Sequence, residues 1–233
     1  METLEIGKVV CRVTRRDRRS VCFRVTKDGV PEILAPKRMA LYKIKELMLP
    51  YRERIEAECE RQRDMILSRE AFSLDYGSRV RFFGAEREIR AGDVHRMFID
   101  NEAVYLPAML SREEIRTSTV ELYKKYAVEY ISQRVSELAA LMELSPSAVK
   151  INSATSHWAS CSRRGSLNFS WFCIMASSEA IDYIVVHELC HMREFNHSKR
   201  FWENVAVYCP DYKRHRAYLK ELWREILSEN WGK

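Results

Sequence analysis

Glycine and proline are scarce in this chain of 233 residues, with seven and six residues respectively. This is about half the usual share, and it argues against a collagen-like sequence, long flexible linkers and a glycine-punctuated β repeat. No uncharged run approaches the roughly 18–20 apolar residues that a membrane-spanning helix needs. The first five residues contain two acids, where a secretory signal would carry basic residues before an apolar run. We therefore expect a cytoplasmic protein that makes no membrane contact.

Seven cysteines are present, and no two of them form a Cys-x-x-Cys pair. Their odd number and scattered positions favour reduced, mostly packed thiols over a disulfide framework or a four-cysteine zinc site. Apolar residues make up 46% of the chain, which is enough to build a sizeable core. No internal repeat and no low-complexity tract is evident from the sequence.

Positive charge is concentrated near the start of the chain. Residues 8–38 contain ten Lys or Arg and three acids, a local charge of +7 against +6 for the whole chain. We call its central residues the arginine group: Arg12, Arg15, Arg16, Arg18 and Arg19. A solvated hairpin rim is the simplest interpretation, and a surface for phosphate or nucleic acid is the alternative. No aromatic residue interleaves with these arginines, which weakens the case for single-strand binding.

Apolar residues that alternate with polar ones predict strands over 9–13 and 21–25. A third strand is expected over 30–35, and short strands return over 79–106. The residues between them follow a helical pattern over 38–67, which Pro50 interrupts. Asp28-Gly29 predicts a hairpin turn, and Ser111 is expected to cap a long helix that ends near Leu144. After residue 146, short strands surround Gly165, and three helices follow. We therefore expect an α+β protein with a strand-rich and helical region over 1–145 and a second region over 146–233.

The segment His187-Glu188-Leu189-Cys190-His191 reads H-E-x-x-H inside a helix predicted over 178–195. Residues four apart lie about 40° apart around a helix, so His187 and His191 point the same way and can bind one zinc ion. Glu188 is rotated by about 100° from His187. It need not be a ligand, and it can take a proton from water on the metal. Cys190 points elsewhere and is expected to be a buried thiol.

His197 is the leading candidate for a third ligand, because its spacing equals that of H-E-x-x-H-x-x-G-x-x-H zinc enzymes. A continuous helix would turn it by about 240° from His191, so the helix must end between them, and we expect the break at 195–197. The glycine of that pattern is Glu194 here, and no methionine follows residue 192, which argues against a metzincin. Glu203 and His215 are the alternative ligands. Three protein ligands leave one position for water, as in catalytic zinc sites.

Further segments accompany this motif: Trp158-Ala159-Ser160-Cys161-Ser162, Gly165 with Leu167-Asn168, Asn196-His197-Ser198 with Phe201-Trp202, and Cys209-Pro210-Asp211-Tyr212. Together with residues 181–191, they resemble the YgjP-like metallopeptidase domain, a group similar to SprT-like and WLM zinc peptidases. The resemblance is dense from about residue 150 to 220, and it extends weakly to the arginine-rich N-terminus. Ala159 stands where the family usually has glycine, and His157 stands where it usually has arginine.

The resemblance implies a zincin-like catalytic region, in which a small sheet lies above the H-E-x-x-H helix. It implies one Zn²⁺ per chain, with His187, His191 and His197 as ligands and Glu188 as the catalytic acid and base. In zincins an edge strand beside this helix binds extended peptide, and residues 167–171 are the candidate strand here. The candidate substrate-binding residues are Asn168, Trp158, Tyr212 and His157, of which the last two could donate to an oxyanion.

We therefore expect a zinc metallopeptidase that hydrolyses peptide bonds with metal-activated water. One competing hypothesis is a zinc-dependent nucleotide phosphohydrolase, whose substrate phosphates the arginine group would hold. Against it, the chain has no G-x-x-x-x-G-K-[ST] loop and no carboxylate cluster for Mg²⁺. A third hypothesis is a DNA-associated protease docked through the arginine group, and a fourth is a zinc-binding module without enzymatic activity.

Overall fold

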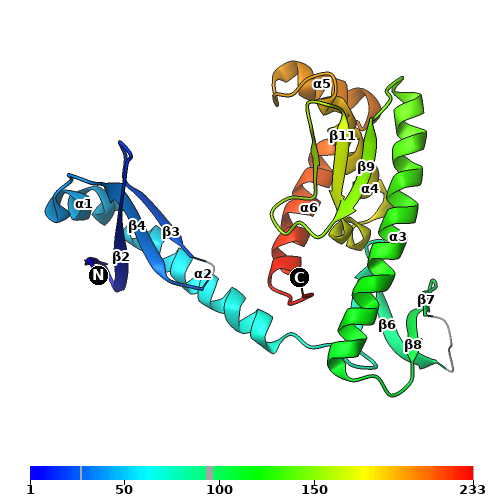
Figure 1. The fold of residues 1–233 in the computed structure, drawn as a ribbon, viewed down its shortest axis with the longest axis horizontal. Coiled ribbons are helices and arrows are strands. Elements are labelled where there is room, and N and C mark those ends of the chain that lie inside the picture. Colours follow the sequence, from blue (N-terminus) through cyan, green and yellow to red (C-terminus); the bar gives the residue numbers. More distant parts are fainter. Residues whose placement is uncertain (27, 93–96, 233) are drawn as a thin grey trace. The chain divides into compact units, whose positions relative to one another are not determined.

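The computed structural model describes residues 1–26, 28–92 and 97–232 and contains two compact units (Figure 1). Unit 1 is Met1–Phe72 and unit 2 is Ser73–Lys233. The chain is mixed α+β, with small sheets and helices in both units, as predicted. The boundary expected at residue 145 falls within unit 2, just after its longest helix. None of the helices in the described ranges has the length and apolar character that a membrane span requires.

Unit 1 is a four-stranded sheet followed by helices. Its elements are β1 (Thr3–Ile6), β2 (Val9–Arg16), β3 (Cys22–Val25), β4 (Pro31–Pro36), α1 (Leu41–Met48), the 3₁₀ helix η1 (Leu49–Tyr51) and α2 (Arg52–Ala71). Pro50 lies in η1 and separates α1 from α2, because proline lacks the N–H that a continuous helix needs. Apolar side chains of the sheet pack against α1 and the start of α2, with Ile33 and Ile44 fully buried at the centre.

The strand order in unit 1 is β1-β2-β4-β3, and it corrects the expectation of an arginine-rich hairpin. β2 and β3 are not neighbours, because β4 lies between them and runs parallel to β2. The hairpins instead join β1 to β2 through Gly7, with φ of 61°, and β3 to β4 through the predicted turn at Asp28-Gly29. The arginine group therefore lies along β2 and the connection that follows it.

Unit 2 begins with the same topology. Its first elements are β5 (Arg79–Phe82), β6 (Ala85–Gly92), β7 (Phe98–Ile99), β8 (Ala103–Pro107) and α3 (Arg112–Leu141). The order β5-β6-β8-β7 repeats the order and the pairing directions of the first sheet. In each sheet, the turn between the first two strands contains a glycine with positive φ, Gly7 in unit 1 and Gly84 in unit 2. The parallel pair of strands in each sheet ends on a proline, Pro36 in unit 1 and Pro107 in unit 2. The chain thus contains an internal structural repeat that was not evident from the sequence.

The rest of unit 2 is a second sheet covered by helices. Its elements are β9 (Ala148–Asn152), β10 (Ala159–Cys161), β11 (Ser166–Ser170), the 3₁₀ helix η2 (Trp171–Met175), α4 (Ser178–His191), α5 (Lys199–Tyr208) and α6 (Tyr212–Leu227). β11 is the central strand, antiparallel to β10 and parallel to β9. Helix α4 contacts α3, α5, α6 and β10 (Figure 1), so it lies at the centre of this part of the fold.

Candidate functional site

Helix α4 carries the H-E-x-x-H motif in its last turns. Ser177 caps its N-terminus, since its side chain accepts a hydrogen bond from the backbone N–H of Ala180. Ile181, Val185 and Leu189, spaced four apart, have no exposed surface. These residues fix the helix in the core, so the side chains at its C-terminal end occupy a rigid position.

Helix α4 ends at His191, four residues before the predicted end at residue 195. The backbone N–H groups of Met192 and Arg193 bond to carbonyls three residues back, and this tighter winding closes the helix. Ser198 caps α5 as predicted, by accepting a hydrogen bond from the N–H of Phe201. The break between the two helices turns His197 back toward α4.

His187, His191 and His197 converge, and the nitrogens they offer all lie within 4.8 Å of one another. The Nε2 atoms of His187 and His197 are 3.1 Å apart. Nδ1 of His191 lies 3.1 Å from the backbone carbonyl of Glu194, so Nδ1–H donates to that oxygen and Nε2 keeps a lone pair. A backbone carbonyl that orients an imidazole in this way is typical of metal-binding histidines.

The protonation of His187 and His191 suits a metal. Burial, with smaller contributions from His191 and His197, lowers the pKa of His187 to about 3. Burial also lowers the pKa of His191. Both imidazoles are therefore neutral at pH 7, the form that binds metals. Nδ1 of His187 is also buried and has no hydrogen-bond partner in the described part of the chain. Three nitrogen donors of this kind fit a divalent ion such as Zn²⁺, with a fourth position for water.

Glu188 is buried beside this cluster, with 6% of its surface exposed. Its Oε2 atom has no hydrogen-bond partner among the described residues, and burial raises the pKa of the carboxyl to about 8. Its charge contributes to the raised pKa values of Cys161 on β10 and Cys173 in η2, so the carboxyl group lies near both. A carboxyl group whose pKa is close to neutrality is suited to proton transfer.

Aromatic residues of α5 surround the histidines. Phe201 is fully buried, and its ring centre lies 4.5 Å from that of His191 and 4.9 Å from that of His187. Trp202 stacks on His197, with ring centres 5.5 Å apart. The guanidinium of Arg216 lies 5.0 Å from the Trp202 ring. Arg216 was not predicted, because nothing distinguishes it in sequence from the other basic residues of α6.

The structure corrects the predicted substrate strand. Residues 167–171 do not form an edge, because β11 has β10 on one side and β9 on the other. Asn168 is paired across both ladders, with Ser160 and Lys150. The edge strand that contacts α4 is β10. Ala159 starts this strand and is not among the described residues with positive φ, so it fits where the family usually has glycine.

The remaining predicted substrate-binding residues have different neighbours. Tyr212 stacks on Trp202, with ring centres 5.1 Å apart, and so lies close to the histidines. Trp158 instead packs against Trp223, at 4.4 Å. His157 is exposed, and its Nδ1 bonds to Ser156.

Neither Glu203 nor His215 belongs to the histidine cluster of the described residues. Glu203 is exposed and lies 3.7 Å from Lys199. His215 is buried and stacks on Tyr183, with ring centres 6.2 Å apart. Cys190 is fully buried, as predicted.

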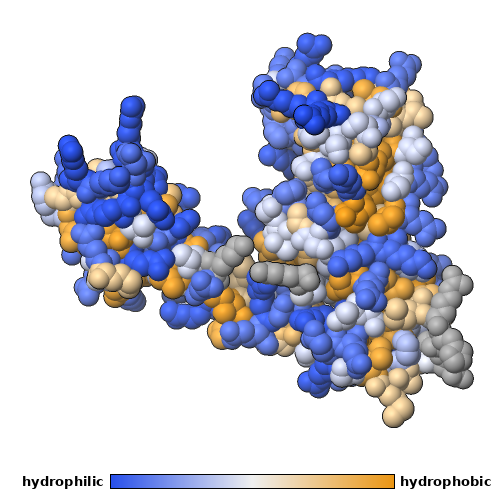
Figure 2. Space-filling model, viewed as in Figure 1, coloured by the Kyte–Doolittle hydropathy of each residue, from blue (hydrophilic) through white to orange (hydrophobic). Residues whose placement is uncertain are grey.

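The arginine group is partly engaged inside unit 1. Arg12 pairs with the buried carboxylate of Glu32 at 3.0 Å. Arg15 pairs with Glu2 at 2.7 Å and donates to the carbonyl of Pro36. Hydrophilic residues cover most of the face of unit 1 visible in Figure 2, in keeping with its 17 basic and 12 acidic residues. Two of the five arginines are thus committed to intramolecular ion pairs.

The comparisons with known proteins agree with the resemblance noted from the sequence. No curated protein matches the chain. The family model described as the YgjP-like metallopeptidase domain matches residues 19–222, which include most of unit 1, the H-E-x-x-H helix and His197. This match covers well over half of the chain and confirms the expected family. The chain therefore belongs to the YgjP-like metallopeptidase domain family.

Proposed function

We propose that this chain is a zinc-dependent peptidase of the H-E-x-x-H type with a zincin-like catalytic region. In this proposal His187, His191 and His197 hold one Zn²⁺, and Glu188 is the general base. The observation that carries it is the convergence of three imidazoles within 4.8 Å, next to a buried carboxyl oxygen without a partner. When bound, the metal would polarise the scissile carbonyl and lower the pKa of a water to about 7.

The chain's own residues then have distinct roles. Glu188 accepts the proton of the attacking water and passes it to the leaving nitrogen, a transfer to which a carboxyl pKa near neutrality is suited. The carbonyl of Glu194 holds His191 in the tautomer that leaves Nε2 free. Phe201 fills the space beside His187 and His191 and keeps water from their buried sides.

The substrate is proposed to lie along β10. This strand is an edge of its sheet and contacts α4, so an extended peptide can pair with Ala159–Cys161 and pass the histidine cluster. Tyr212 is the better supported of the two predicted oxyanion donors, because it stacks on Trp202 next to His197. We keep residues 146–233 as the proposed catalytic region, since they contain all of these groups.

The competing functions receive less support. The family match does not favour a nucleotide phosphohydrolase. A DNA-docking role is weakened because Arg12 and Arg15 already have carboxylate partners. The cytoplasmic location stays a prediction from the sequence.

The test replaces Glu188 with Gln, which removes the base but keeps the size of the side chain. We expect hydrolysis of a quenched fluorescent peptide library to fall by about 10²–10⁴-fold, while zinc content stays near one per chain. The matched control is Glu203→Gln, an exposed position outside the cluster, and it should retain full activity. Undiminished hydrolysis by Glu188→Gln would contradict the glutamate mechanism. Failure of the native chain to take up zinc would contradict the metal assignment.

A further inference from the structure

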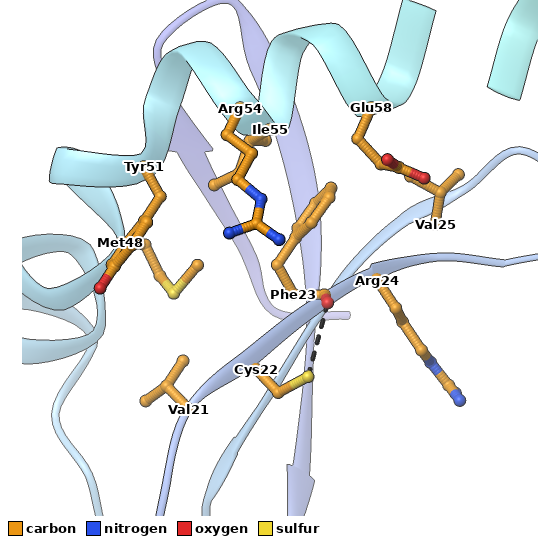
Figure 3. A pocket seen from close by; sticks show the side chains of 10 residues that line it. All are labelled: Val21, Cys22, Phe23, Arg24, Val25, Met48, Tyr51, Arg54, Ile55 and Glu58. Atoms are coloured by element: carbon orange, nitrogen blue, oxygen red, sulfur yellow. Dashed lines mark hydrogen bonds between the residues drawn. The ribbon is translucent and has the colours of Figure 1, made fainter. Parts of the chain in front are cut away.

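An open pocket of about 510 Å³ lies in unit 1, between strand β3 and the helices α1, η1 and α2 (Figure 3). Its lining residues are Val21, Cys22, Phe23, Arg24, Val25, Met48, Tyr51, Arg54, Ile55 and Glu58. Met48 and Ile55 are buried and form an apolar floor, to which Val21 and Phe23 add partly buried side chains. A volume of this size lies within the range of ligand-binding clefts.

One wall of this pocket is an open sheet edge. β3 is the last strand of its sheet and pairs only with β4 in the described part of unit 1. Thr26 donates its N–H to the carbonyl of Val30. Residues of an antiparallel strand bond to the partner strand and point away from it in alternation, so Thr26 faces β4 and its neighbour Val25 does not. Val25 and Phe23, two residues before it, therefore direct their backbone N–H and C=O groups to the open side. The Cys22 thiol lies 3.4 Å from the Phe23 carbonyl, as expected of an oxygen outside the ladder (Figure 3).

The pocket also contains one unpaired cation. Arg54 is exposed, and it forms no hydrogen bond or ion pair with any described residue. Its guanidinium extends from α2 toward β3 (Figure 3). The other charged residues are already paired, Arg24 with Glu32 at 2.6 Å and Glu58 with Arg61. The position of Arg54 therefore complements a carboxylate of the molecule that binds here.

We propose that this groove binds an extended polypeptide segment, which adds to β3 as an outer strand. The segment would pair with the backbone of Phe23 and Val25, place apolar side chains over Met48 and Ile55, and present an acidic side chain to Arg54. The combination of a free strand edge, an apolar floor and a single cation is the arrangement used in peptide recognition by strand addition.

The same features disfavour other occupants. A row of backbone donors and acceptors at about 3.3 Å per residue matches another extended backbone. A nucleic acid would need several free cations, whereas the lining offers Arg54 alone. This proposal is independent of the chemistry of unit 2, because every lining residue belongs to unit 1.

The probe is a random library of 12-residue peptides displayed on phage. It is selected on the full chain carrying Glu188→Gln, which avoids cleavage, and in parallel on the same chain with Arg54→Glu. We expect peptides with alternating apolar residues and an acidic residue to be enriched on the first chain alone. Fluorescein-labelled versions of these peptides should bind roughly tenfold more weakly to the Arg54→Glu chain in fluorescence anisotropy, since a charge-assisted hydrogen bond is lost.

Two controls localise the binding. Arg63→Glu makes the same charge change nine residues along α2, about 180° around the helix, and should change affinity less than twofold. Arg54→Gln removes the charge without reversing it and should weaken binding in the same direction. Cys22 is the only exposed cysteine of the seven, and saturating peptide should slow its reaction with a maleimide several-fold.

Three results would overturn the proposal. The first is that no peptide is enriched beyond the level on the Arg54→Glu chain. The second is that the enriched peptides bind both chains equally and leave Cys22 equally reactive. The third is that sedimentation detects a dimer that Arg54→Glu dissociates, which would assign the groove to a second copy of the chain.

Discussion

Removal of one histidine should abolish most of the stabilisation that zinc confers on unit 2. The proposed ligands all lie in this unit, with His187 and His191 on α4 and His197 just before α5. A ligand that binds only the folded state stabilises it by RT ln(1 + [L]/Kd). The comparison of native chain and His197→Ala therefore measures how much His197 contributes to binding.

The expected magnitude follows from this relation. At a free zinc concentration of 100 Kd, the folded state gains about 2.7 kcal/mol. For a unit of 150–250 residues, each kcal/mol raises Tm by about 2–4 °C, so the native shift should be about 5–11 °C. Loss of a residue that only hydrogen-bonds a metal ligand already lowers metal affinity by up to about 100-fold. If His197→Ala lowers zinc affinity by at least this factor, zinc at the same concentration stabilises the folded variant by about 0.4 kcal/mol or less. Its Tm should then rise by about 1–2 °C at most.

The assay is scanning calorimetry with buffered zinc and, separately, with chelator. Each variant is compared with its own metal-free form, so any loss of intrinsic stability cancels. His157→Ala is the matched control, because this histidine is exposed and bonds to Ser156 outside the cluster. Glu203→Ala tests the alternative ligand and should also retain the full shift. A full shift in His197→Ala, or its loss in Glu203→Ala, would refute the assignment of the third ligand.

Two further predictions concern stability. Hydrogen bonds from Thr14, Arg24 and Arg12 lower the pKa of the buried Glu32 to about 2. Glu32→Gln should therefore lower the free energy of unfolding of unit 1, measured by urea denaturation, by about 2 kcal/mol. This is less than the cost of breaking a fully buried ion pair, because both arginines are partly exposed. The pKa of Glu32 in the folded state lies below the ordinary value of 4.5, so this stabilisation is complete above pH 4.5 and is lost as the pH falls toward 2. An equal pH dependence of the free energy of unfolding in the native chain and in Glu32→Gln would contradict this. Ser111→Ala removes half of the capping box with Glu114 and should lower the free energy of unfolding by about 1 kcal/mol, whereas Ser136→Ala, exposed within the same helix, serves as its comparison and should not lower it.

Local sequence signals located most elements. Period-two alternation identified β2 and β3, and Ser111 and Ser198 identified two helix starts, because these signals act over a few neighbouring residues. Strand β1 was missed, although Leu4 and Ile6 alternate with polar residues, because four residues are too few for a periodic signal. The internal repeat was also missed, since its two copies share topology and register but few residue identities.

The sequence by itself determined the metal-site hypothesis, since the spacing of His187, Glu188 and His191 along a helix fixes which side chains share a face. It also determined the need for a break before His197. Only the tertiary structure decided where α4 ends, that β11 is central and β10 is the edge, and that Arg12 and Arg15 pair with distant carboxylates. Strand order and ion pairs depend on residues far apart in the chain, and their energies arise only when the core has packed, so no local pattern encodes them.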